Sequence, residues 1–342
     1  MRAQLIALDW GTTSLRAYKL AEGGKVLEQR SLSSGIMQLP KVPRIIAGRE
    51  CTDGFELAFD EACSDWLDAQ PGLPVIACGM VGSAQGWREA AYRDTPANVA
   101  TLGTSLQTVR SIRGIDVHIV PGVIQRSRLP NVMRGEETQV LGVLQNLPGE
   151  AGEAGEAGEA GEAGGDLLIG LPGSHSKWVE VADGCIVHFD TFMTGEIFAV
   201  LSEHSILGRT QQRSATFDGD AFDRGVQVAL SADGEIGPLS TLFSARSLGL
   251  TGELSATAQA DYLSGLLIGH ELSALACAQR RRRNSVHLPS IILIGNAQLC
   301  ARYSRALDAC GFARVTLAEQ ATEHGLWQLA LAAGLITLTL SR

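Results

Sequence analysis

Several sequence patterns that are typical of particular protein classes are missing from this chain. Its seven cysteines are scattered and none belongs to a Cys-x-x-Cys pair, so neither a disulfide framework nor a zinc site is predicted. No apolar run approaches the roughly 20 residues of a membrane span, and the first apolar run is too short for a signal peptide. We therefore expect reduced cysteines and a cytoplasmic location.

Basic charge and the common nucleotide-binding loops are also lacking. The formal net charge is -9, which argues against a nucleic-acid partner because affinity for phosphate backbones comes mainly from clustered Lys and Arg. Neither a GxxxxGK[ST] P-loop nor a GxGxxG fingerprint is present. A nucleotide-binding function would have to use another type of phosphate turn.

Length and composition indicate a two-domain globular protein. The chain has 342 residues, and single cores tend to stop growing near ~250 to 300 residues. Apolar residues make up 45% and charged residues 19%, which is typical of a well-buried globular chain. We expect two lobes with a cleft.

Two stretches of the chain show the same pattern of strands and turns. Strands are predicted at 5–8, 15–20 and 26–31, and again at 167–171, 178–181 and 185–189, with short polar or glycine-containing turns between them. Helices are predicted near 55–69, from about 136, and at 196–202, 221–230, 257–281, 297–309 and from about 324, with strands at 75–78, 291–294 and 315–317. Strands that alternate with helices predict an α/β protein built from two copies of one unit.

Residues 150–164 are five consecutive Glu-Ala-Gly triplets. Such a tract has no apolar face to bury, and a glycine at every third position disfavours a helix. We interpret it as a solvated insert between the two halves, with an acidic partner-binding arm as the alternative.

The turn that follows the first strand carries phosphate-binding chemistry. Asp9 stands at the end of a buried strand, and Gly11, Thr12 and Thr13 gather hydroxyls and backbone N–H groups in the turn. A carboxylate in this place can hold Mg²⁺ directly or through water, because that cation prefers oxygen ligands. An ordinary polar hairpin is the alternative.

The second meander repeats this device at residues 171–178, where Gly173 and Ser174 form a glycine-containing turn. Lys177 could add a point charge, although a lysine at the start of a strand is more often a solvated edge residue. The pair Ser174-His175 is not interpreted as a nucleophile with its base, because adjacent residues rarely align that way and no GxSxG elbow is present.

These motifs resemble those of a known superfamily. Asp9-x-Gly11-Thr12-Thr13 is similar to the first phosphate motif of the sugar kinases, actin and chaperone ATPases, Pro172-Gly173-Ser174 to the second, and Ile292-Leu293-Ile294-Gly295-Asn296 to the adenosine motif. A closer resemblance, to the 2-dehydro-3-deoxygalactonokinase family, is carried in order by residues 8–16, 79–83, 131–139, 171–178, 193–196 and 263–269. Ser174 and Ser176 stand where Thr and Cys are expected in relatives.

The resemblance implies two ribonuclease H-like domains of the actin/hexokinase type with a nucleotide cleft between them. We expect an N-terminal domain at 1–148, the insert at 149–165, a C-terminal domain at 166–323, and a final helix at 324–342 that packs back on the N-terminal domain. The implied activity is transfer of the ATP γ-phosphoryl group to the 6-hydroxyl of 2-dehydro-3-deoxy-D-galactonate, a step in galactose or galactonate catabolism, with Mg²⁺ as the metal ion. The expected partner is this small sugar acid, with no nucleic acid or membrane, and a homodimer is left open.

The resemblance also assigns roles to residues. The nucleotide-binding candidates are Gly11, Thr12, Thr13, Arg16, Gly173, Ser174, His175, Lys177, Gly295 and Asn296. The candidates for the sugar-acid pocket are Gly79, Met80, Val81, Gly82, Ser83, Trp87 and Arg134, where the guanidinium of Arg134 suits a substrate carboxylate. The structural alternatives are a glycine-rich connection for the loop, an ion pair for Arg134, and a simple strand-to-helix turn for Gly295-Asn296.

The catalytic candidates are Glu136, Glu137 and Asp9, and Asp9 is also the candidate for the metal. Residues 135–139 resemble the Gly-Asp-Gln stretch that carries the catalytic acid in related sugar kinases, which favours Glu136 as the base with Glu137 second. The alternative is that paired acids at a helix start only complement the helix dipole. Two other functions stay open: a kinase of another sugar acid or polyol, and a nucleotide-dependent sensor without phosphoryl transfer.

Overall fold

The structure, a computed structural model, describes residues 1–144, 167–283, 287–312 and 314–338. Contacts between residues divide the chain into two compact units. The first contains the described residues before 145 together with 181–189 and 318–338, and the second contains the described residues of 167–180 and 190–317. The Glu-Ala-Gly insert and the expected boundary at 148 lie outside the described residues.

The first unit opens with a strand meander and closes with the last helix of the chain. Its strands are β1 (Leu5–Trp10), β2 (Leu15–Leu20), β3 (Val26–Leu32), β4 (Arg44–Ile46), β5 (Arg49–Cys51), β6 (Val75–Gly79), β7 (Arg93–Asp94), β8 (Gln107–Arg110), β9 (Asp116–Ile119), β10 (Val123–Gln125) and β11 (Asn131–Met133). Its helices are η1 (Glu22–Gly24), α1 (Gly54–Ala69), η2 (Met80–Gly82), α2 (Val99–Gly103), α3 (Glu136–Leu144) and α11 (Ala321–Ala332).

The second unit begins with another meander and continues into a group of helices. The strands of its sheet are β12 (Leu167–Leu171), β13 (Ser176–Ala182), β14 (Cys185–Phe192), β15 (Ser290–Leu293) and β16 (Val315–Leu317). Residues 181–189, at the end of β13 and in most of β14, are grouped with the first unit. The helices are α4 (Thr194–His204), η3 (Gly208–Thr210), α5 (Gly219–Leu230), α6 (Ala232–Glu235), α7 (Pro238–Thr241), α8 (Ser244–Leu250), α9 (Gln259–Arg283) and α10 (Ala297–Ala309).

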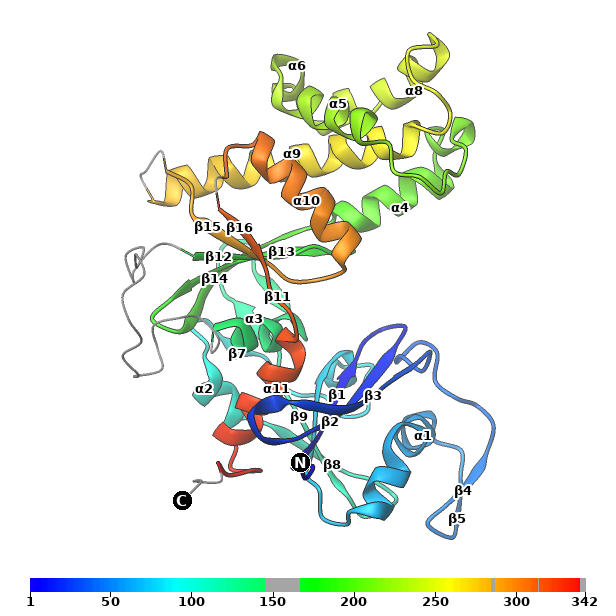
Figure 1. The fold of residues 1–342 in the computed structure, drawn as a ribbon, viewed down its shortest axis with the longest axis vertical. Helices are drawn as coiled ribbons and strands as arrows, with labels where there is room; N and C mark the ends of the chain where they lie inside the picture. The colour runs from blue at the N-terminus through cyan, green and yellow to red at the C-terminus, as the bar shows by residue number, and fades with distance from the viewer. Residues whose placement is uncertain (145–166, 284–286, 313, 339–342) are drawn as a thin grey trace. The chain divides into compact units, whose positions relative to one another are not determined.

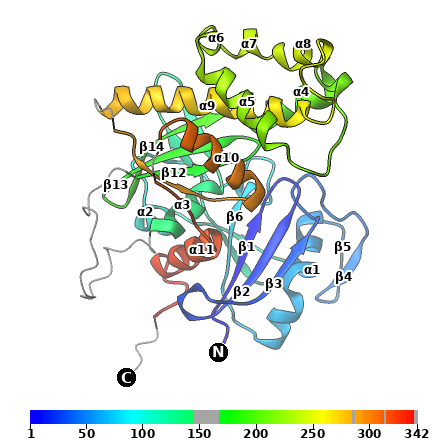
Figure 2. The ribbon, with the colours of Figure 1, turned by 45° about the horizontal axis from the view of Figure 1, so that its top comes forward.

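The two main sheets repeat one strand order. The first runs β3-β2-β1-β6-β9-β8, and the second runs β14-β13-β12-β15-β16. In the first sheet β1 pairs antiparallel with β2 and parallel with β6, and in the second β12 pairs parallel with β15, which pairs parallel with β16. Figure 2 shows β1, β2 and β3 side by side. The predicted duplication of one unit is confirmed over these five strand positions.

Apolar residues place β1 in the core of the first unit. Five of the six residues of β1 are buried, which is typical of a strand that is covered on both faces. Helix α1 covers this sheet through Phe59, Cys63 and Trp66, and it begins where the Asp53 side chain accepts hydrogen bonds from the backbone N–H groups of Phe55 (2.8 Å) and Glu56 (3.4 Å). Caps of this kind stabilise a helix start by about 1 kcal/mol.

In the helical part of the second unit, α5 packs along α9, as both views show (Figures 1 and 2). The side chains of Phe222 and Val226 on α5 and of Tyr262 and Leu266 on α9 are buried. Helix α9 was predicted at 257–281 and is found two residues further along the chain. Although it has 25 residues, no helix in the described part of the chain is long and apolar enough to cross a membrane.

Helices α3 and α11 of the first unit cross at two glycines. A Cβ on Gly325 of α11 would lie 1.9 Å from the Thr138 carbonyl oxygen, and one on Gly142 of α3 would lie 1.9 Å from the Ala321 carbonyl oxygen. Gln139 Nε2 also donates a hydrogen bond to Thr322 Oγ1 at 3.2 Å. The backbones of the two helices are therefore in direct contact, and α11 supports the helix that begins at Glu136.

Replacing Gly325 by alanine should separate these helices. Gly325→Ala raises intrinsic helix propensity, yet we expect it to lower the free energy of unfolding by about 1–3 kcal/mol, because the new methyl group has no space. Urea unfolding measures the change, and Gln328→Ala on the half-buried side of α11 is the control. A Gly325→Ala protein as stable as the unchanged one would show that the helices do not touch here.

Candidate functional site

The turn after β1 is held by backbone hydrogen bonds. Gly11 N–H donates to the Ser14 carbonyl (2.9 Å), and the N–H groups of Ile36 and Met37 donate to the carbonyls of Gly11 and Thr12, each at 3.0 Å. The side chains of Thr12 and Thr13 are exposed. The turn thus presents two hydroxyls from a fixed backbone, as the phosphate motif requires, and the segment around Ile36 is a support that the sequence did not reveal.

Asp9 lies at the end of β1, opposite Arg16 in β2. The Arg16 Nη1 atom is 3.2 Å from Asp9 Oδ2, and 19% of the Asp9 side chain is exposed. Burial raises the pKa of Asp9, and the Arg16 charge opposes that shift. The carboxylate therefore has one cationic partner and access to solvent at the carboxyl end of a central strand.

Glycines bring three of the predicted motifs together in the first unit. Gly79 pairs with Trp10 across β1 and β6 and has φ +91°. A Cβ on Gly79 would lie only 2.8 Å from the Trp10 carbonyl oxygen. A Cβ on Gly135 would lie 3.2 Å from the Gly79 Cα atom. Only glycine fits such approaches without strain. The strand carrying Asp9, the loop that begins at Gly79 and the start of α3 consequently meet at one place.

The two glutamates at the start of α3 have different surroundings. Glu136 is partly exposed, and its Oε2 atom accepts a hydrogen bond from the Arg134 backbone N–H at 3.0 Å. Glu137 has no exposed surface: its Oε2 accepts from Gly135 N–H at 2.7 Å, and its Oε1 accepts from Thr138 Oγ1 at 3.1 Å. Of the two, Glu136 is the carboxylate that a bound molecule can reach.

Burial raises the pKa of Glu137 to about 8, and the neighbouring negative charge of Glu136 adds to this shift. Glu137 is therefore mainly protonated at neutral pH. A buried carboxyl that accepts a hydrogen bond from Gly135 N–H is a structural group, and it leaves Glu136 as the partly exposed carboxyl of the pair.

The loop after β6 presents mainly backbone. Val81 and Gly82 are buried, and the Ser83 hydroxyl is buried without a hydrogen-bond partner in the described residues. The Trp87 ring stacks on Phe55 with centroids 6.2 Å apart and meets the Trp10 ring edge-on at 5.9 Å. Trp87 is therefore packed against the core of the first unit, and the Val81 side chain points into that core.

Arg134 is held beside the same loop. Its Nη2 atom donates to the Ala90 carbonyl at 2.8 Å, and its guanidinium carbon lies 4.4 Å from the centroid of the Tyr92 ring. The Nε and Nη1 atoms are buried and have no hydrogen-bond partner within the described part of the chain. Unpaired buried donors are costly, so this arginine retains capacity for an anionic partner.

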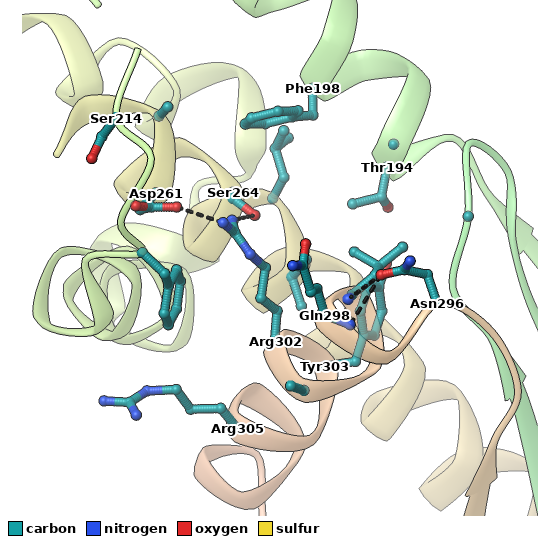
Figure 3. A pocket seen from close by; sticks show the side chains of 18 of the residues that line it. Thr194, Phe198, Ser214, Asp261, Ser264, Asn296, Gln298, Arg302, Tyr303 and Arg305 are labelled. Carbon is teal, nitrogen blue, oxygen red and sulfur yellow. Dashed lines mark hydrogen bonds and ion pairs between the residues drawn. The ribbon is translucent and has the colours of Figure 1, made fainter. Parts of the chain in front are cut away.

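A cavity of about 1040 Å³ lies within the second unit (Figure 3). Its wall contains the turn residues Gly173 and Ser174, the start of α4 at Thr194 and Gly195, and Asn296. The start of α4 is fixed to the turn, because Glu196 N–H donates to the Ser174 carbonyl at 3.0 Å. The second phosphate motif and the adenosine motif thus share one wall.

The residues of these two motifs are placed as follows. The Asn296 side chain caps α10 by accepting hydrogen bonds from the N–H groups of Gln298 (3.0 Å) and Leu299 (3.2 Å), and Gly295 passes close to the Pro172 carbonyl. His175 is half exposed and pairs through Nε2 with Glu196 Oε2. Lys177 is buried in β13, so the alternative of a solvated edge lysine is wrong.

Beneath the cavity lies a buried carboxyl group that sequence reasoning missed. Glu271 accepts hydrogen bonds from Trp178 Nε1 at 2.6 Å and from Tyr303 Oη at 2.8 Å, and Ser176 Oγ is 2.9 Å from Tyr303 Oη. Burial raises the pKa of Glu271, while hydrogen bonds from Thr194 and these groups oppose the shift. Thr194 and Tyr303 line the cavity, so this network fixes part of its wall.

Among the described residues, no group of three or more His, Cys, Asp or Glu side chains is arranged to hold a metal ion. Asp9 offers a partly exposed carboxylate, an oxygen ligand of the kind that Mg²⁺ takes directly or through water. Glu323, in the first turn of α11, is a second acid nearby: burial raises its pKa, and the charge of Asp9 adds to the shift.

Stability should depend on pH through Glu137. Because its pKa is raised in the folded state, the folded protein binds more protons than the unfolded chain between about pH 4.5 and 8, so this group's contribution to stability is lost as the pH rises through that window. The slope is at most about 1.4 kcal/mol per pH unit. Glu137→Gln should remove this slope in denaturant unfolding from pH 5 to 9, and equal slopes in both proteins would show that Glu137 is charged.

Removing the Glu271 carboxyl should leave the Trp178 and Tyr303 donors unpaired. We expect Glu271→Ala to lower the free energy of unfolding by about 3 kcal/mol or more, since each buried unsatisfied group costs about 1–3 kcal/mol. Glu271→Gln, which has the same shape and keeps one acceptor, should lose less. Urea unfolding distinguishes them, and a loss below about 1 kcal/mol for the alanine variant would contradict the network.

Comparison with known proteins agrees with this geometry. An Escherichia coli K12 protein, a 2-dehydro-3-deoxygalactonokinase, is 33% identical over 316 residues, which cover 91% of each chain. A Rhizobium meliloti protein assigned the same activity is 34% identical over 324 residues, 94% of each chain. A crystal structure of a Sinorhizobium meliloti protein with that assignment has a TM-score of 0.75 at 32% identity and covers 96% of this chain and 98% of that one.

The family match itself spans residues 9–329, from the carboxylate at the end of β1 to the helix that supports α3. The predicted fold class, an α/β protein of two ribonuclease H-like units of the actin/hexokinase type, is confirmed by the repeated sheet order and by the crystal structure of the relative. The predicted resemblance is confirmed as well: this chain belongs to the 2-keto-3-deoxy-galactonokinase family.

Proposed function

We propose that the protein transfers the γ-phosphoryl group of ATP to the 6-hydroxyl of 2-dehydro-3-deoxy-D-galactonate, forming the 6-phosphate and ADP. The observation that carries the proposal is the meeting of Asp9, Gly79 and Gly135 at the ends of two central strands, with Glu136 next in the chain. Phosphoryl transfer needs mainly positioning and charge neutralisation, and this place offers a carboxylate, hydroxyls and a base close together.

Glu136 is the base of this reaction. As the 6-hydroxyl oxygen bonds to the γ-phosphorus, the bond from that phosphorus to the bridging oxygen of ADP breaks, and the hydroxyl proton passes to the Glu136 carboxylate. The backbone N–H of Arg134 fixes that carboxylate at 3.0 Å. A carboxylate suffices because the proton needs to leave only late in a loose transition state.

Each unit, taken by itself, has groups that suit a nucleotide. In the first unit Thr12 and Thr13 supply hydroxyls for phosphate oxygens. In the second unit Gly173 and Ser174 supply a turn on the wall of the cavity, which Asn296 of the adenosine motif also lines. Asp9 would hold Mg²⁺, directly or through water, and the cation would neutralise charge on the phosphates. Arg16 keeps the Asp9 carboxylate oriented.

The sugar acid is held by the loop that follows β6 and by Arg134. The unpaired Nε and Nη1 atoms of Arg134 and the unpaired Ser83 hydroxyl support this assignment, because a carboxylate accepts hydrogen bonds from such donors. Trp87 acts here as the packed support of the loop. Gly79 to Ser83 approach the substrate mainly through their backbone.

The direct test is a coupled assay of ADP release. Mg-ATP is offered with 2-dehydro-3-deoxy-D-galactonate, its gluconate epimer, glycerol and common hexoses. We expect turnover with the galactonate compound to exceed that with every other acceptor. Preference for a different acceptor would mean that the substrate is that acceptor. If no acceptor led to ADP release, the proposal that the protein is a kinase would be wrong.

The two glutamates of α3 give a matched pair of variants. Glu136→Gln should lower kcat by about 10²–10⁴, the usual contribution of a general base. Glu137→Gln should keep kcat within about threefold, because Glu137 is already neutral at the assay pH. Steady-state kinetics at pH 7 measure both, and the opposite ranking would transfer the role of base to Glu137.

A further inference from the structure

Arg302 crosses the wall of the cavity in the second unit, and neither the motifs nor the family comparison gives it a role. It belongs to α10, two turns after the cap at Asn296, and its side chain extends toward Asp261 and Ser264 (Figure 3). The Nη2 atom lies 2.8 Å from Asp261 Oδ1, and Nη1 donates to Ser264 Oγ at 3.2 Å. Both terminal nitrogens of the guanidinium thus have partners within the protein.

The guanidinium is also fixed on one side by an aromatic ring. Its central carbon lies 4.5 Å from the centroid of the Phe217 ring. Hydrogen bonds to a guanidinium lie in its plane. The contacts with Asp261 and Ser264 therefore do not cover the face of the guanidinium that is turned away from Phe217. Since 28% of the side chain is exposed and the residue lines the cavity, part of the Arg302 side chain is available to a bound molecule.

Asp261 connects the two walls that carry these groups. Its Oδ2 atom accepts a hydrogen bond from the Asp218 backbone N–H at 2.8 Å, while its Oδ1 atom pairs with Arg302. Asp218 directly follows Phe217 and caps α5 by accepting from Ala221 N–H at 3.0 Å. One buried carboxylate therefore sets the position of Arg302 and of the segment that carries Phe217.

This arrangement is poorly suited to a phosphate and well suited to a flat, uncharged ring. The charge of Arg302 is already paired with that of Asp261, and each of its two terminal nitrogens already has a partner in the protein. A planar group held in one orientation can instead stack on a nucleobase, as arginine and aromatic side chains commonly do. The phosphate motif at Gly173 and Ser174 lies on the same cavity, so base and phosphates can be bound by one molecule.

We propose that Arg302, clamped by Asp261, Ser264 and Phe217, is the platform on which the nucleobase of the nucleotide stacks. Asp261 is a positioning residue that acts through Arg302 and the Phe217 segment. The inference rests on the proposed function, because the cavity is taken as the nucleotide site. It adds the residue that binds the base, and it predicts that Arg302 contributes to binding of the base and not to binding of the phosphates.

The test measures binding of three probes, ADP, adenosine and inorganic tripolyphosphate, by calorimetry on the full chain. Arg302→Ala should weaken ADP and adenosine by the same factor of about tenfold, within the range known for base stacking, and leave tripolyphosphate unchanged. Arg302→Lys keeps the charge but loses the plane and should behave like the alanine variant. Asp261→Asn should weaken ADP by a smaller factor.

Arg224→Ala is the matched control, because Arg224 is ion-paired with Glu253 at 3.1 Å in the same unit and does not line the cavity. Its affinity for all three probes should equal that of the unchanged protein. In steady-state kinetics Arg302→Ala should raise KM for ATP about tenfold and leave kcat and KM for the sugar acid unchanged.

Three results would overturn the inference. If Arg302→Ala weakened the binding of tripolyphosphate and ADP equally, Arg302 would be a phosphate contact. If Arg302→Ala bound adenosine with full affinity, the role of Arg302 would be purely structural. If Arg302→Lys recovered the affinity, only the charge of Arg302 would matter. Adenosine binding too weak to detect in the unchanged protein would also count against a base platform. Absence of sugar-acid turnover, by contrast, would remove the kinase proposal and leave these affinity comparisons intact.

Discussion

Close approach of one backbone to another at glycine is the constraint on which the working parts of this protein depend. In the first unit the Trp10 carbonyl, Gly79 and Gly135 touch, and in the second a Cβ on Gly195 would lie 2.4 Å from the Gly173 carbonyl oxygen. The candidate site residues are short polar side chains and backbone N–H groups that lie at the ends of strands. A methyl group at any of these contacts would push one backbone segment away from the other. The glycine contacts therefore fix the backbone positions from which the polar side chains extend.

Much of the fold could be predicted from the sequence, for identifiable reasons. The meanders were found because apolar strands alternate with glycine-containing turns such as Asp183-Gly184, and α1, α9 and α10 because they are long. The strands β8 and β9 and the helices α6 to α8 were missed. They are four to seven residues long, and elements this short are stabilised by tertiary contacts that no local pattern records.

The candidate site was predictable only where chemistry is concentrated in a motif. Asp9, Gly173 and Asn296 stand beside strand ends that periodicity can locate. Sequence could not decide between Glu136 and Glu137, because which of two adjacent acids is buried depends on how α3 packs. The partnership of Arg302 with Asp261 was invisible for the same reason, since its members are on different helices and neither belongs to a recognisable pattern. For Lys177 the error was different. Lysines at strand starts are usually exposed, but Lys177 is buried in β13.

The crossing of α3 and α11 has a consequence for the order in which the protein can mature. The first unit is discontinuous: its sheet is encoded before residue 145, but the helix that supports α3 comes from residues 321–332. A chain emerging from the ribosome therefore makes the second unit before it can complete the first. The half that carries Glu136 lacks the backbone surface of Gly325 until translation is nearly finished, so a nascent or prematurely released chain cannot yet hold the start of α3 in place.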